Sequence, residues 1–340
     1  MDMVTSSKGN PLIAELDDTD LACLVALQAQ PRASWRELGA ATGIAERTVA
    51  RRIKRLMDAD ALRVIAEPDP LATGRGVVLH AWVRCRSGRV PDVAERLARL
   101  DISQLIVTLA GSADLMAELT LADAADMPDV VTRVLPSIDG VEHVEARLVL
   151  RPFRRAGQWR IQPQLGGGAD APALPPPSAL SDAEQRMVAH LMRDGRASLA
   201  ELAERAGVSE PTAHRLLQNL VERRALSFRV EVEPALVGFP VEAVISVQVR
   251  PQAVDALAAH LALDPHTRCL FGTSGASQLF WHVLCRDSLH LWEVVTRRLG
   301  ELDGVLNSDV GVVMRAHKRC GIVRAGTRLG PEADSGPSGT

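Results

Sequence analysis

Residues 45–57 read AERTVARRIKRLM, a sequence with the spacing of an amphipathic helix. Val49, Ile53 and Leu56 recur at intervals of four and three residues and form one apolar face. Five basic residues against one acid, Glu46, leave this helix with a charge of +4. Such a helix can also be the solvated face of an unrelated helical domain, and the flanking sequence has to distinguish the two interpretations.

The sequence around this helix supplies the other parts of a helix-turn-helix. Ser34 and Glu37 form a capping-box pattern that starts a short helix, and Gly43 permits the tight turn before the basic helix. Residues 16–30 predict a further helix whose leucines face a core, and residues 63–67 predict a strand that would be a wing. In such a unit the basic helix enters the DNA major groove.

The second half of the chain repeats the first at an offset of 164 residues. Residues 16–62 and 180–226 share 15 identities in 47 ungapped positions, and self-similarity at a fixed offset indicates duplicated structural units. The capping box recurs as Ser198 and Glu201. Matching Pro, Gly and Asp-Gly-Val positions continue at the same offset, so the duplication extends beyond the helical unit.

Each repeat continues into a second unit of about 80 residues. In the first copy the apolar patterning predicts the order β-α-β-β-α-β, the ferredoxin-like split motif. The predicted elements are strand 77–84, helix 90–100, strands 105–110 and 115–121, helix 127–135 and strand 141–150. A sheet with helices on one face leaves its other face bare, so we expect the two units to pair through these faces. Pairing within one chain is slightly favoured over pairing between chains, because a tethered partner is present at high effective concentration.

The predicted fold class is α+β, with a duplicated winged helix-turn-helix followed by a ferredoxin-like βαββαβ domain. The predicted domains are a winged helix-turn-helix over 16–67, a ferredoxin-like domain over 76–153, a Gly-rich and then Pro-rich linker over 156–178, a second winged helix-turn-helix over 180–231 and a second ferredoxin-like domain over 240–319.

Composition limits the class of protein further. A net charge of −3 over 340 residues means that nucleic-acid binding has to come from local basic patches. Five cysteines without a CxxC pattern argue against a disulfide framework and against a zinc cluster. No apolar run approaches 18 residues, so no membrane span is predicted. We therefore expect a cytoplasmic protein without metal, cofactor or membrane association.

Together these motifs resemble the leucine-responsive/asparagine (Lrp/AsnC) transcriptional regulators. The resemblance rests on LDDTD at 16–20, the helix pair at 33–56, PLATG at 70–74, GSAD at 111–114 and DGV at 139–141, and on their second copies. It covers about 280 of the 340 residues. It implies sequence-specific binding of double-stranded DNA, assembly into a homo-oligomer through the ferredoxin-like effector domains, and a small-molecule effector that is often an amino acid.

Two alternatives remain open. Sirohaem decarboxylases resemble the same two domains, and some are fused pairs, but the sequence shows no clear match to their histidine-containing strand segment. The other alternative is an assembly protein that does not bind DNA. A bound tetrapyrrole that absorbs visible light would favour the enzyme, whereas failure to bind duplex DNA in a salt-dependent manner would favour the assembly protein.

The candidate DNA contacts of the first copy lie on the basic helix. We expect Arg47 and Arg51 to read base edges, and Arg52 and Arg55 to contact phosphate. The complete set of candidates is Glu46, Arg47, Thr48, Arg51, Arg52 and Arg55.

The equivalent helix of the second copy carries less charge. Over residues 209–220 the single arginine and the single glutamate cancel, and electrostatic affinity depends on the number of phosphates neutralised, so this copy should bind DNA more weakly. A purely structural spacer is the alternative. Its candidate DNA contacts are Thr212, His214, Arg215 and Gln218.

The turn at 111–114 is the candidate effector site, because the resemblance places the equivalent turn between neighbouring effector domains. Asp114 could accept an effector's ammonium group and the turn amides could hold its carboxylate, whereas the alternative is a plain hairpin turn. In the second copy Gln278 replaces the aspartate, which makes two equivalent sites doubtful. The candidate effector contacts are Gly111, Ser112, Asp114, Gly275, Ser277 and Gln278.

The nine histidines show no metal-binding spacing. Those on predicted strands are expected to be structural rather than ligands, and they are His80, His143, His282 and His317.

Overall fold

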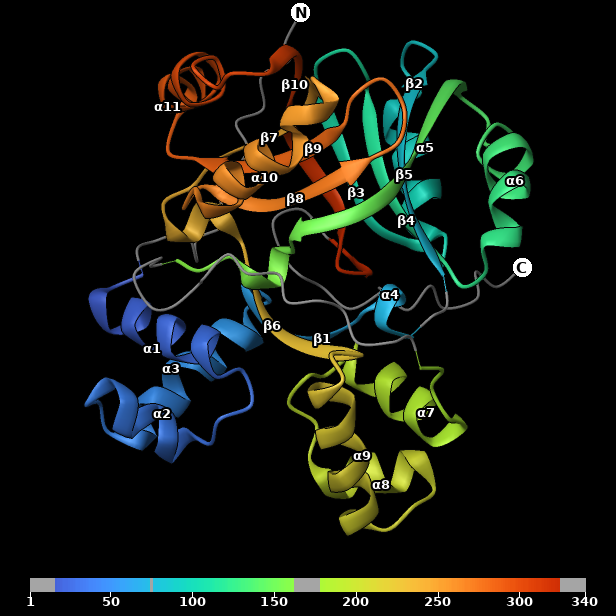
Figure 1. The fold of residues 1–340 in the computed structure, drawn as a ribbon. Helices are drawn as coiled ribbons and strands as arrows, with labels where there is room; N and C mark the ends of the chain where they lie inside the picture. Colours follow the sequence, from blue (N-terminus) through green and yellow to red (C-terminus); the bar gives the residue numbers. More distant parts are fainter. Residues whose placement is uncertain (1–15, 74–75, 162–177, 325–340) are drawn as a thin grey trace, which may run out of the picture.

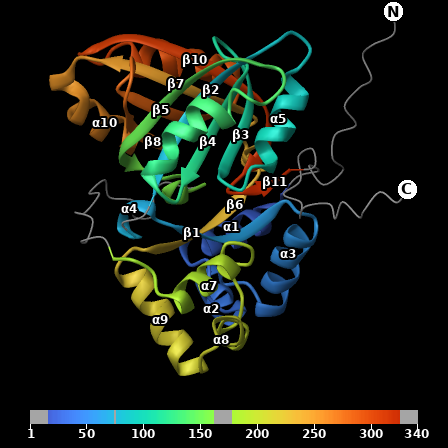
Figure 2. The same cartoon turned by 90° about the vertical axis from the view of Figure 1, so that its right-hand side faces the viewer.

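The computed structural model describes residues 16–73, 76–161 and 178–324. Two helical units lie below a β-barrel, and a pair of strands lies between them and the barrel (Figure 1; Figure 2). The chain passes through one helical unit, one strand of the pair and half of the barrel, and then repeats this order. The architecture is therefore the duplicated α+β fold that the sequence predicts.

Each helical unit consists of three helices around a core of its own. The first unit contains α1 (Asp18–Ala29), α2 (Trp35–Thr42) and α3 (Glu46–Asp58), and the second contains α7 (Asp182–Leu191), α8 (Leu199–Ala206) and α9 (Glu210–Glu222). The predicted capping boxes open α2 and α8, where serine and glutamate satisfy each other's backbone amides. Gly43 and Gly207 close these helices at φ values of +70° and +69°, which glycine adopts without steric cost.

The strand after each helical unit is not a wing of that unit alone. β1 (Leu62–Pro68) pairs antiparallel with β6 (Leu226–Val232), from Leu62 opposite Val232 to Pro68 opposite Leu226. Val230 and Val232 of β6 pack into the core of the first helical unit, and Ala66 of β1 packs into that of the second. The strand predicted over 63–67 is therefore present, but it does not act as a wing of its own unit alone. Each strand of the pair satisfies its backbone groups on the other and contributes to the other unit's core.

The barrel is built from two four-stranded halves with the predicted β-α-β-β-α-β order. The strands of the first half are β2 (Val77–Cys85), β3 (Ser103–Ala110), β4 (Leu115–Leu121) and β5 (Val141–Arg154). The strands of the second half are β7 (Val241–Val249), β8 (Thr267–Thr273), β9 (Leu279–Cys285) and β10 (Val305–Arg319). Helical segments cover the outside: α5 (Val90–Arg99), α10 (Val254–Leu263), η2 (Ala124–Asp126) with α6 (Met127–Asp129) and η3 (Val130–Val134), and α11 (Ser288–Glu293) with η7 (Val294–Leu299).

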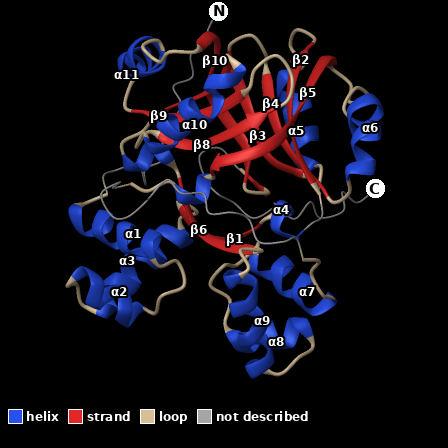
Figure 3. Cartoon of the chain, viewed as in Figure 1, coloured by secondary structure: helices blue, strands red, loops and turns tan. Residues whose placement is uncertain are grey.

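The two halves join edge to edge within one chain. β5 pairs with β8 and β3 pairs with β10, while β7 also pairs with β10, so the strands form a closed ring (Figure 3). The faces that carry no helices point inward and share an apolar cluster that includes Trp82, Met116, Val244 and Phe280. The preference for pairing within the chain is therefore confirmed, and closure also removes the exposed strand edges that two separate sheets would leave.

Short segments connect these elements, and part of the predicted linker is among them. η4 (Ala156–Gln158) follows β5, Trp159 is buried in the core of the first helical unit, and the Ile161 amide donates to Gln28 Oε1 at 3.0 Å. Residues 156–161 are therefore structured rather than linker, because Trp159 gains a buried apolar site. Residues 162–177 of that prediction lie outside the described residues. The remaining short elements are α4 (Pro70–Thr73), η5 (Pro234–Val237), η6 (Pro251–Ala253) and β11 (Ile322–Val323).

Within the described ranges, no helix combines the length and the apolar character that crossing a bilayer requires.

Candidate functional site

The basic face of α3 lies on the surface of the first helical unit. Val49, Ile53 and Leu56 are buried beneath it, as the spacing predicts. The side chains on the other faces are exposed at Glu46, Arg47, Arg51, Lys54 and Arg55, and half-buried at Thr48 and Arg52. Among the described residues, no salt bridge holds Arg47, Arg51 or Lys54. These three cations are therefore placed to meet an external anion.

Two arginines of α3 bind α1 instead. Arg52 Nη1 lies 2.6 Å from Asp17 Oδ2 and 3.1 Å from Asp20 Oδ1, and its side chain is only 20% exposed. Arg55 Nη2 lies 2.7 Å from Asp20 Oδ2, but this side chain remains 52% exposed. The backbone amide of Asp20 and then the Arg52 guanidinium lower the pKa of Asp17. A phosphate contact of Arg52 would therefore require breaking internal ion pairs, whereas Arg55 can still reach outward.

The corresponding helix α9 exposes the predicted residues with little charge. His214, Arg215 and Gln218 are exposed, and Thr212 is half-buried with its hydroxyl 2.9 Å from that of Ser209. Arg223, at the end of this helix, bonds Glu184 Oε1 at 2.8 Å and is engaged within the protein. Three of the four residues predicted to contact DNA are thus exposed on α9, and its surface lacks the cluster of cations found on α3.

A reciprocal pair of arginines connects the two helical units. Arg32 donates to the carbonyl oxygens of Gly195 and Ala197, and its guanidinium carbon lies 5.1 Å from the centre of the Phe228 ring. Arg196, its counterpart at the 164-residue offset, donates to the carbonyl oxygens of Pro31 and Ala33, each at 2.7 Å. Together with the β1–β6 pair, these contacts fix the position of α3 relative to α9.

The predicted effector turn of the first copy lies against the second half of the barrel. A Cβ built on Gly111 would approach Gly311 Cα to 2.9 Å, and the Ser112 hydroxyl donates to Asp309 of β10. Asp114 Oδ2 accepts a hydrogen bond from the Cys85 amide at 2.8 Å. Part of the carboxylate that would bind an ammonium group therefore already holds the backbone of β2.

The turn of the second copy lies against the first half in the same manner. A Cβ on Gly275 would lie 3.5 Å from Arg147 Cγ of β5, and the Ser277 carbonyl accepts from the Thr273 hydroxyl at 2.9 Å. Gln278 Oε1 accepts from the Val249 amide at 2.8 Å, which is the bond that Asp114 makes in the first copy. The replacement of aspartate by glutamine thus preserves a structural hydrogen bond. The two turns lie at separate junctions of the barrel and do not form one shared site.

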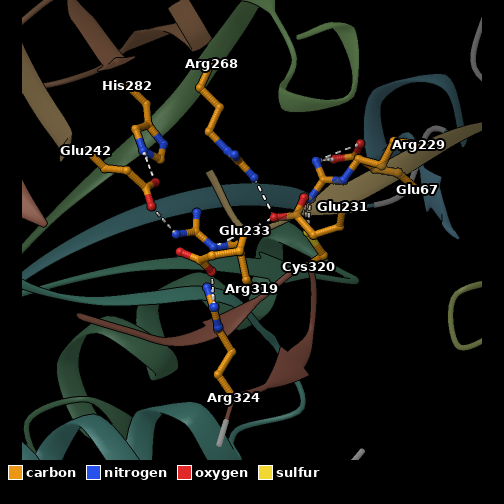
Figure 4. A network of polar contacts seen from close by, with 10 residues as sticks. All are labelled: Glu67, Arg229, Glu231, Glu233, Glu242, Arg268, His282, Arg319, Cys320 and Arg324. Atoms are coloured by element: carbon orange, nitrogen blue, oxygen red, sulfur yellow. Dashed lines mark hydrogen bonds and ion pairs between the residues drawn. The ribbon is translucent and has the colours of Figure 1, made fainter. Parts of the chain in front are cut away.

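A buried cluster of charges, which the sequence patterning does not reveal, lies between the barrel and the β1–β6 pair, and we name the residues drawn in Figure 4 the junction cluster. Glu242 contacts Arg319 at 2.7 Å and His282 at 3.0 Å. Glu231 contacts Arg268 at 2.5 Å and Arg229 at 3.5 Å. All six of these residues come from the second half of the chain, on the strands β6 to β10. The available signal was the presence of charged residues within otherwise apolar strands.

The cluster keeps its acids ionised. Burial alone would raise the pKa of Glu242, but Arg319 and the hydrogen bond from His282 hold it well below its ordinary range. The pKa of Glu231 is likewise lowered, because Arg268 and Arg229 outweigh the effect of burial. Burial lowers the pKa of His282, although Glu242 opposes this. The group therefore consists of ionised Arg–Glu pairs with a neutral histidine at neutral pH.

A cavity of about 400 Å³ adjoins this cluster, and we name it the junction cavity. Its wall includes Ile65 of β1, Arg229 of β6, and Leu105, Glu118 and Phe271 of the barrel strands. It therefore contacts both halves of the barrel and both strands that carry the helical units.

The described part of the chain contains no arrangement of side chains suited to metal binding or to thiol chemistry. No group of three or more His, Cys, Asp or Glu side chains there is placed to hold a metal ion. All five cysteines are free, and burial raises the pKa of Cys85 to about 11 and that of Cys285 to about 12. His80 packs inside the barrel with Nε2 3.3 Å from Glu118 Oε2, and His317 lies 2.7 Å from the Thr108 hydroxyl.

Comparison with protein families identifies domains in both halves. The AsnC-type helix-turn-helix domain matches residues 16–57, and the Lrp/AsnC ligand binding domain matches residues 79–159 and 242–323. The second helical unit matches a different description, the IclR helix-turn-helix domain, over residues 186–229. The chain thus combines an AsnC-type helix-turn-helix with Lrp/AsnC ligand-binding domains.

Curated relatives match about two-fifths of this chain and nearly all of their own length. An uncharacterised HTH-type transcriptional regulator of Pyrococcus furiosus is 28% identical over 143 residues, which cover 41% of this chain and 95% of the relative. The HTH-type transcriptional regulator FL11 of Pyrococcus abyssi is 25% identical over 148 residues, which cover 43% of this chain and 97% of that relative. These relatives therefore have the size of one repeat.

Among solved structures, the sirohaem decarboxylase NirDL has a similar fold over nearly the whole chain. It superposes with a TM-score of 0.60 at 15% identity, covering 90% of this chain and 94% of that protein. At this level of identity the similarity concerns the fold alone.

Proposed function

We propose that this protein is a transcriptional regulator of the Lrp/AsnC type, which binds specific double-stranded DNA and responds to a small effector. The observation that carries the proposal is the exposed basic face of α3, with Arg47, Arg51 and Lys54 uncompensated by salt bridges within the described residues. The AsnC-type domain match over the same helices and the relatives named as HTH-type regulators support it.

The proposed mechanism uses one chain as an unequal pair of DNA-binding units. α3 enters the major groove with Arg47 and Arg51 toward base edges, and Arg55 and Lys54 neutralise phosphates. α9 approaches the duplex with His214 and Gln218 but contributes less electrostatic affinity. Because the arginine pair and the β1–β6 pair hold both helices in fixed positions, a single chain would recognise an asymmetric site.

The proposed effector acts through the ligand-binding domains. The resemblance favours an amino acid as the effector, bound at the turn that contains Asp114. The proposal also includes assembly of several chains through these domains. The second turn, with Gln278, lacks the carboxylate that an ammonium group would need.

A direct test measures binding of the purified full-length protein to duplex DNA selected from random sequence. We expect sequence-specific binding whose affinity falls steeply as salt rises. Arg47→Ala should relax the sequence preference, whereas Arg99→Ala, an exposed arginine on α5, is the matched control. Equal binding of all sequences at physiological salt would contradict the proposal.

A tetrapyrrole-modifying enzyme is the second candidate, because NirDL matches this fold over both halves and not over one repeat alone. NirDL is named a sirohaem decarboxylase, and one of its structures is a complex with an iron-uroporphyrin III analogue. This candidate predicts that the purified protein binds iron-uroporphyrin III with a change in its visible spectrum. Sequence-specific DNA binding without such a change would decide in favour of the regulator.

A further inference from the structure

We propose that the junction cavity binds an anionic amphipathic small molecule, with an apolar body and a carboxylate group. The inference goes beyond DNA binding, because it concerns a ligand that the walls of the cavity select. At about 400 Å³ the cavity falls in the range of small-molecule sites. Leu150 forms part of the wall and is 57% exposed, so the cavity reaches the protein surface.

Apolar side chains from several strands form much of the wall. Val77, Leu105, Val149 and Phe271 come from β2, β3, β5 and β8, and Ile65 comes from β1. A cavity of this volume has room for about a dozen waters at roughly 30 Å³ each, and every water needs two to four polar partners. Apolar walls offer these waters few hydrogen-bond partners. An apolar ligand group that displaces the waters is therefore favoured, because its own surface is removed from water.

The charges on the wall favour an anion. Four arginines and two glutamates line the cavity, which leaves a charge of +2 on its surface: Arg155, Arg229, Arg268, Arg319, Glu67 and Glu118. Glu231 and Glu242, which pair with three of these arginines, lie behind them and outside the cavity wall. Arg155, Arg268 and Arg319 thus have their nearest carboxylates outside the wall, on Asp69, Glu231 and Glu242. Arg229 pairs most closely with Glu67, which is on the wall.

Two of the arginines also keep unused hydrogen-bonding capacity. Arg229 is 8% exposed and Arg319 is 3% exposed, and neither Nε–H group has an acceptor among the described residues. Buried N–H donors without an acceptor cost free energy, and a guanidinium group can bind a carboxylate through two parallel hydrogen bonds. A modest rearrangement of these side chains around an acid would satisfy donors that the described residues leave unpaired.

The position of the cavity connects the ligand to both helical units. Ile65, Ala66 and Pro68 of β1 and Arg229 of β6 contribute to its wall, and α3 leads directly into β1. A ligand bound there touches the strands that hold α3 and α9, at a place separate from the two effector turns. The junction cavity therefore differs from the predicted effector site in its location.

Calorimetric titration of the full-length protein in the absence of DNA tests the proposal, with decanoate and the neutral decan-1-ol as probes. We expect saturable binding of one decanoate per chain and weaker binding of decan-1-ol. Arg155→Met keeps the apolar stem and removes the charge, so it should lower decanoate affinity about tenfold and leave decan-1-ol affinity unchanged. Arg151→Met, four residues earlier on β5 and outside the cavity wall, is the matched control.

A second variant fills the cavity. Thr120→Trp places a large side chain at the wall and should abolish binding of both probes, while an unchanged thermal unfolding curve verifies that the variant folds. Absence of saturable decanoate binding to the unmodified protein would overturn the proposal. Equal affinity for the two probes, or undiminished binding in folded Thr120→Trp, would also overturn it. Because no DNA is present, a failure here is distinct from a failure to regulate.

Discussion

Arg32 and Arg196 occupy equivalent positions in the two halves of the chain, and each donates to two backbone carbonyls of the other helical unit. Both side chains are half-buried, and this burial lowers the pKa of both guanidinium groups. The two repeats therefore form a pseudo-two-fold interface within one molecule, to which each contributes an arginine at the equivalent position.

Replacing Arg32 by Ala should destabilise the contact between the helical units. The carbonyls of Gly195 and Ala197 lie on buried residues and would lose their donors, at a cost of about 1–3 kcal/mol. The free energy of unfolding in urea measures this loss. Arg36→Ala, an exposed arginine on α2, is the control, and an equal effect of the two substitutions would contradict the structural role of Arg32.

Arg51→Ala should weaken DNA binding more than Arg215→Ala. Both side chains are exposed at equivalent positions, but α3 carries a cluster of cations and α9 does not. Each lost phosphate contact lowers the slope of log affinity against log salt by roughly one. Fluorescence anisotropy at several salt concentrations gives both slopes. If the two substitutions have equal effects, the helical units contribute equally and the proposed asymmetry is wrong.

Arg52 should behave as a structural residue and not as a phosphate contact. Arg52→Ala would leave Asp20, which is 1% exposed, with Arg55 as its remaining cation, and should lower the free energy of unfolding. The slope of DNA affinity against salt, measured on the folded variant, should remain that of the unmodified protein. Lys54→Ala, on the same helix and exposed, should give the opposite pattern of a preserved stability and a reduced slope.

The helical units and the strand order were predictable because each follows from local periodicity or from the repeat. The intrachain pairing was only slightly favoured over pairing between chains, because a tethered partner is present at high effective concentration. The role of Arg52 was not, because its partners Asp17 and Asp20 lie on another helix, about 35 residues earlier in the sequence. The same limit applies to the junction cluster, where Arg229 meets Glu67 across 162 residues. Patterning shows that a strand is buried, but it does not show which buried charges will meet.

Asp114→Asn separates the structural role of this side chain from the proposed effector contact. Asparagine keeps an oxygen that can accept from the Cys85 amide, as Gln278 does from the Val249 amide, but it has no charge for an ammonium group. Unfolding free energy should change little, while any shift of DNA affinity by amino acids should disappear. Asp114→Ala, by contrast, should also destabilise the fold. An unaltered response in Asp114→Asn would remove this turn from the effector site.

Stability should fall as the pH drops below about 6.5. Burial lowers the pKa of four described histidines, so each prefers its neutral form in the folded protein: His266, His282, His290 and His317. The unfolded chain binds protons at these histidines from about pH 6.5 downward, and the folded chain does so only at lower pH. Unfolding therefore takes up protons in this window, and the free energy of unfolding decreases with falling pH.

The carboxylates of the junction cluster extend this loss further into the acid range. The pKa values of Glu231 and Glu242 lie below their ordinary range, so their contribution to stability is complete above about pH 4.5 and is lost as the pH falls toward the folded values.

Urea unfolding at pH 7.5, 6.5 and 5.5 isolates the contribution of the histidines, because this range lies above pH 4.5. His317→Gln can keep a hydrogen bond to Thr108 and should reduce the slope by up to one proton, about 1.4 kcal/mol per pH unit, whereas His143→Gln is the surface control. A free energy of unfolding that stays constant or rises from pH 7.5 to 5.5 would show that these histidines are protonated in the folded protein.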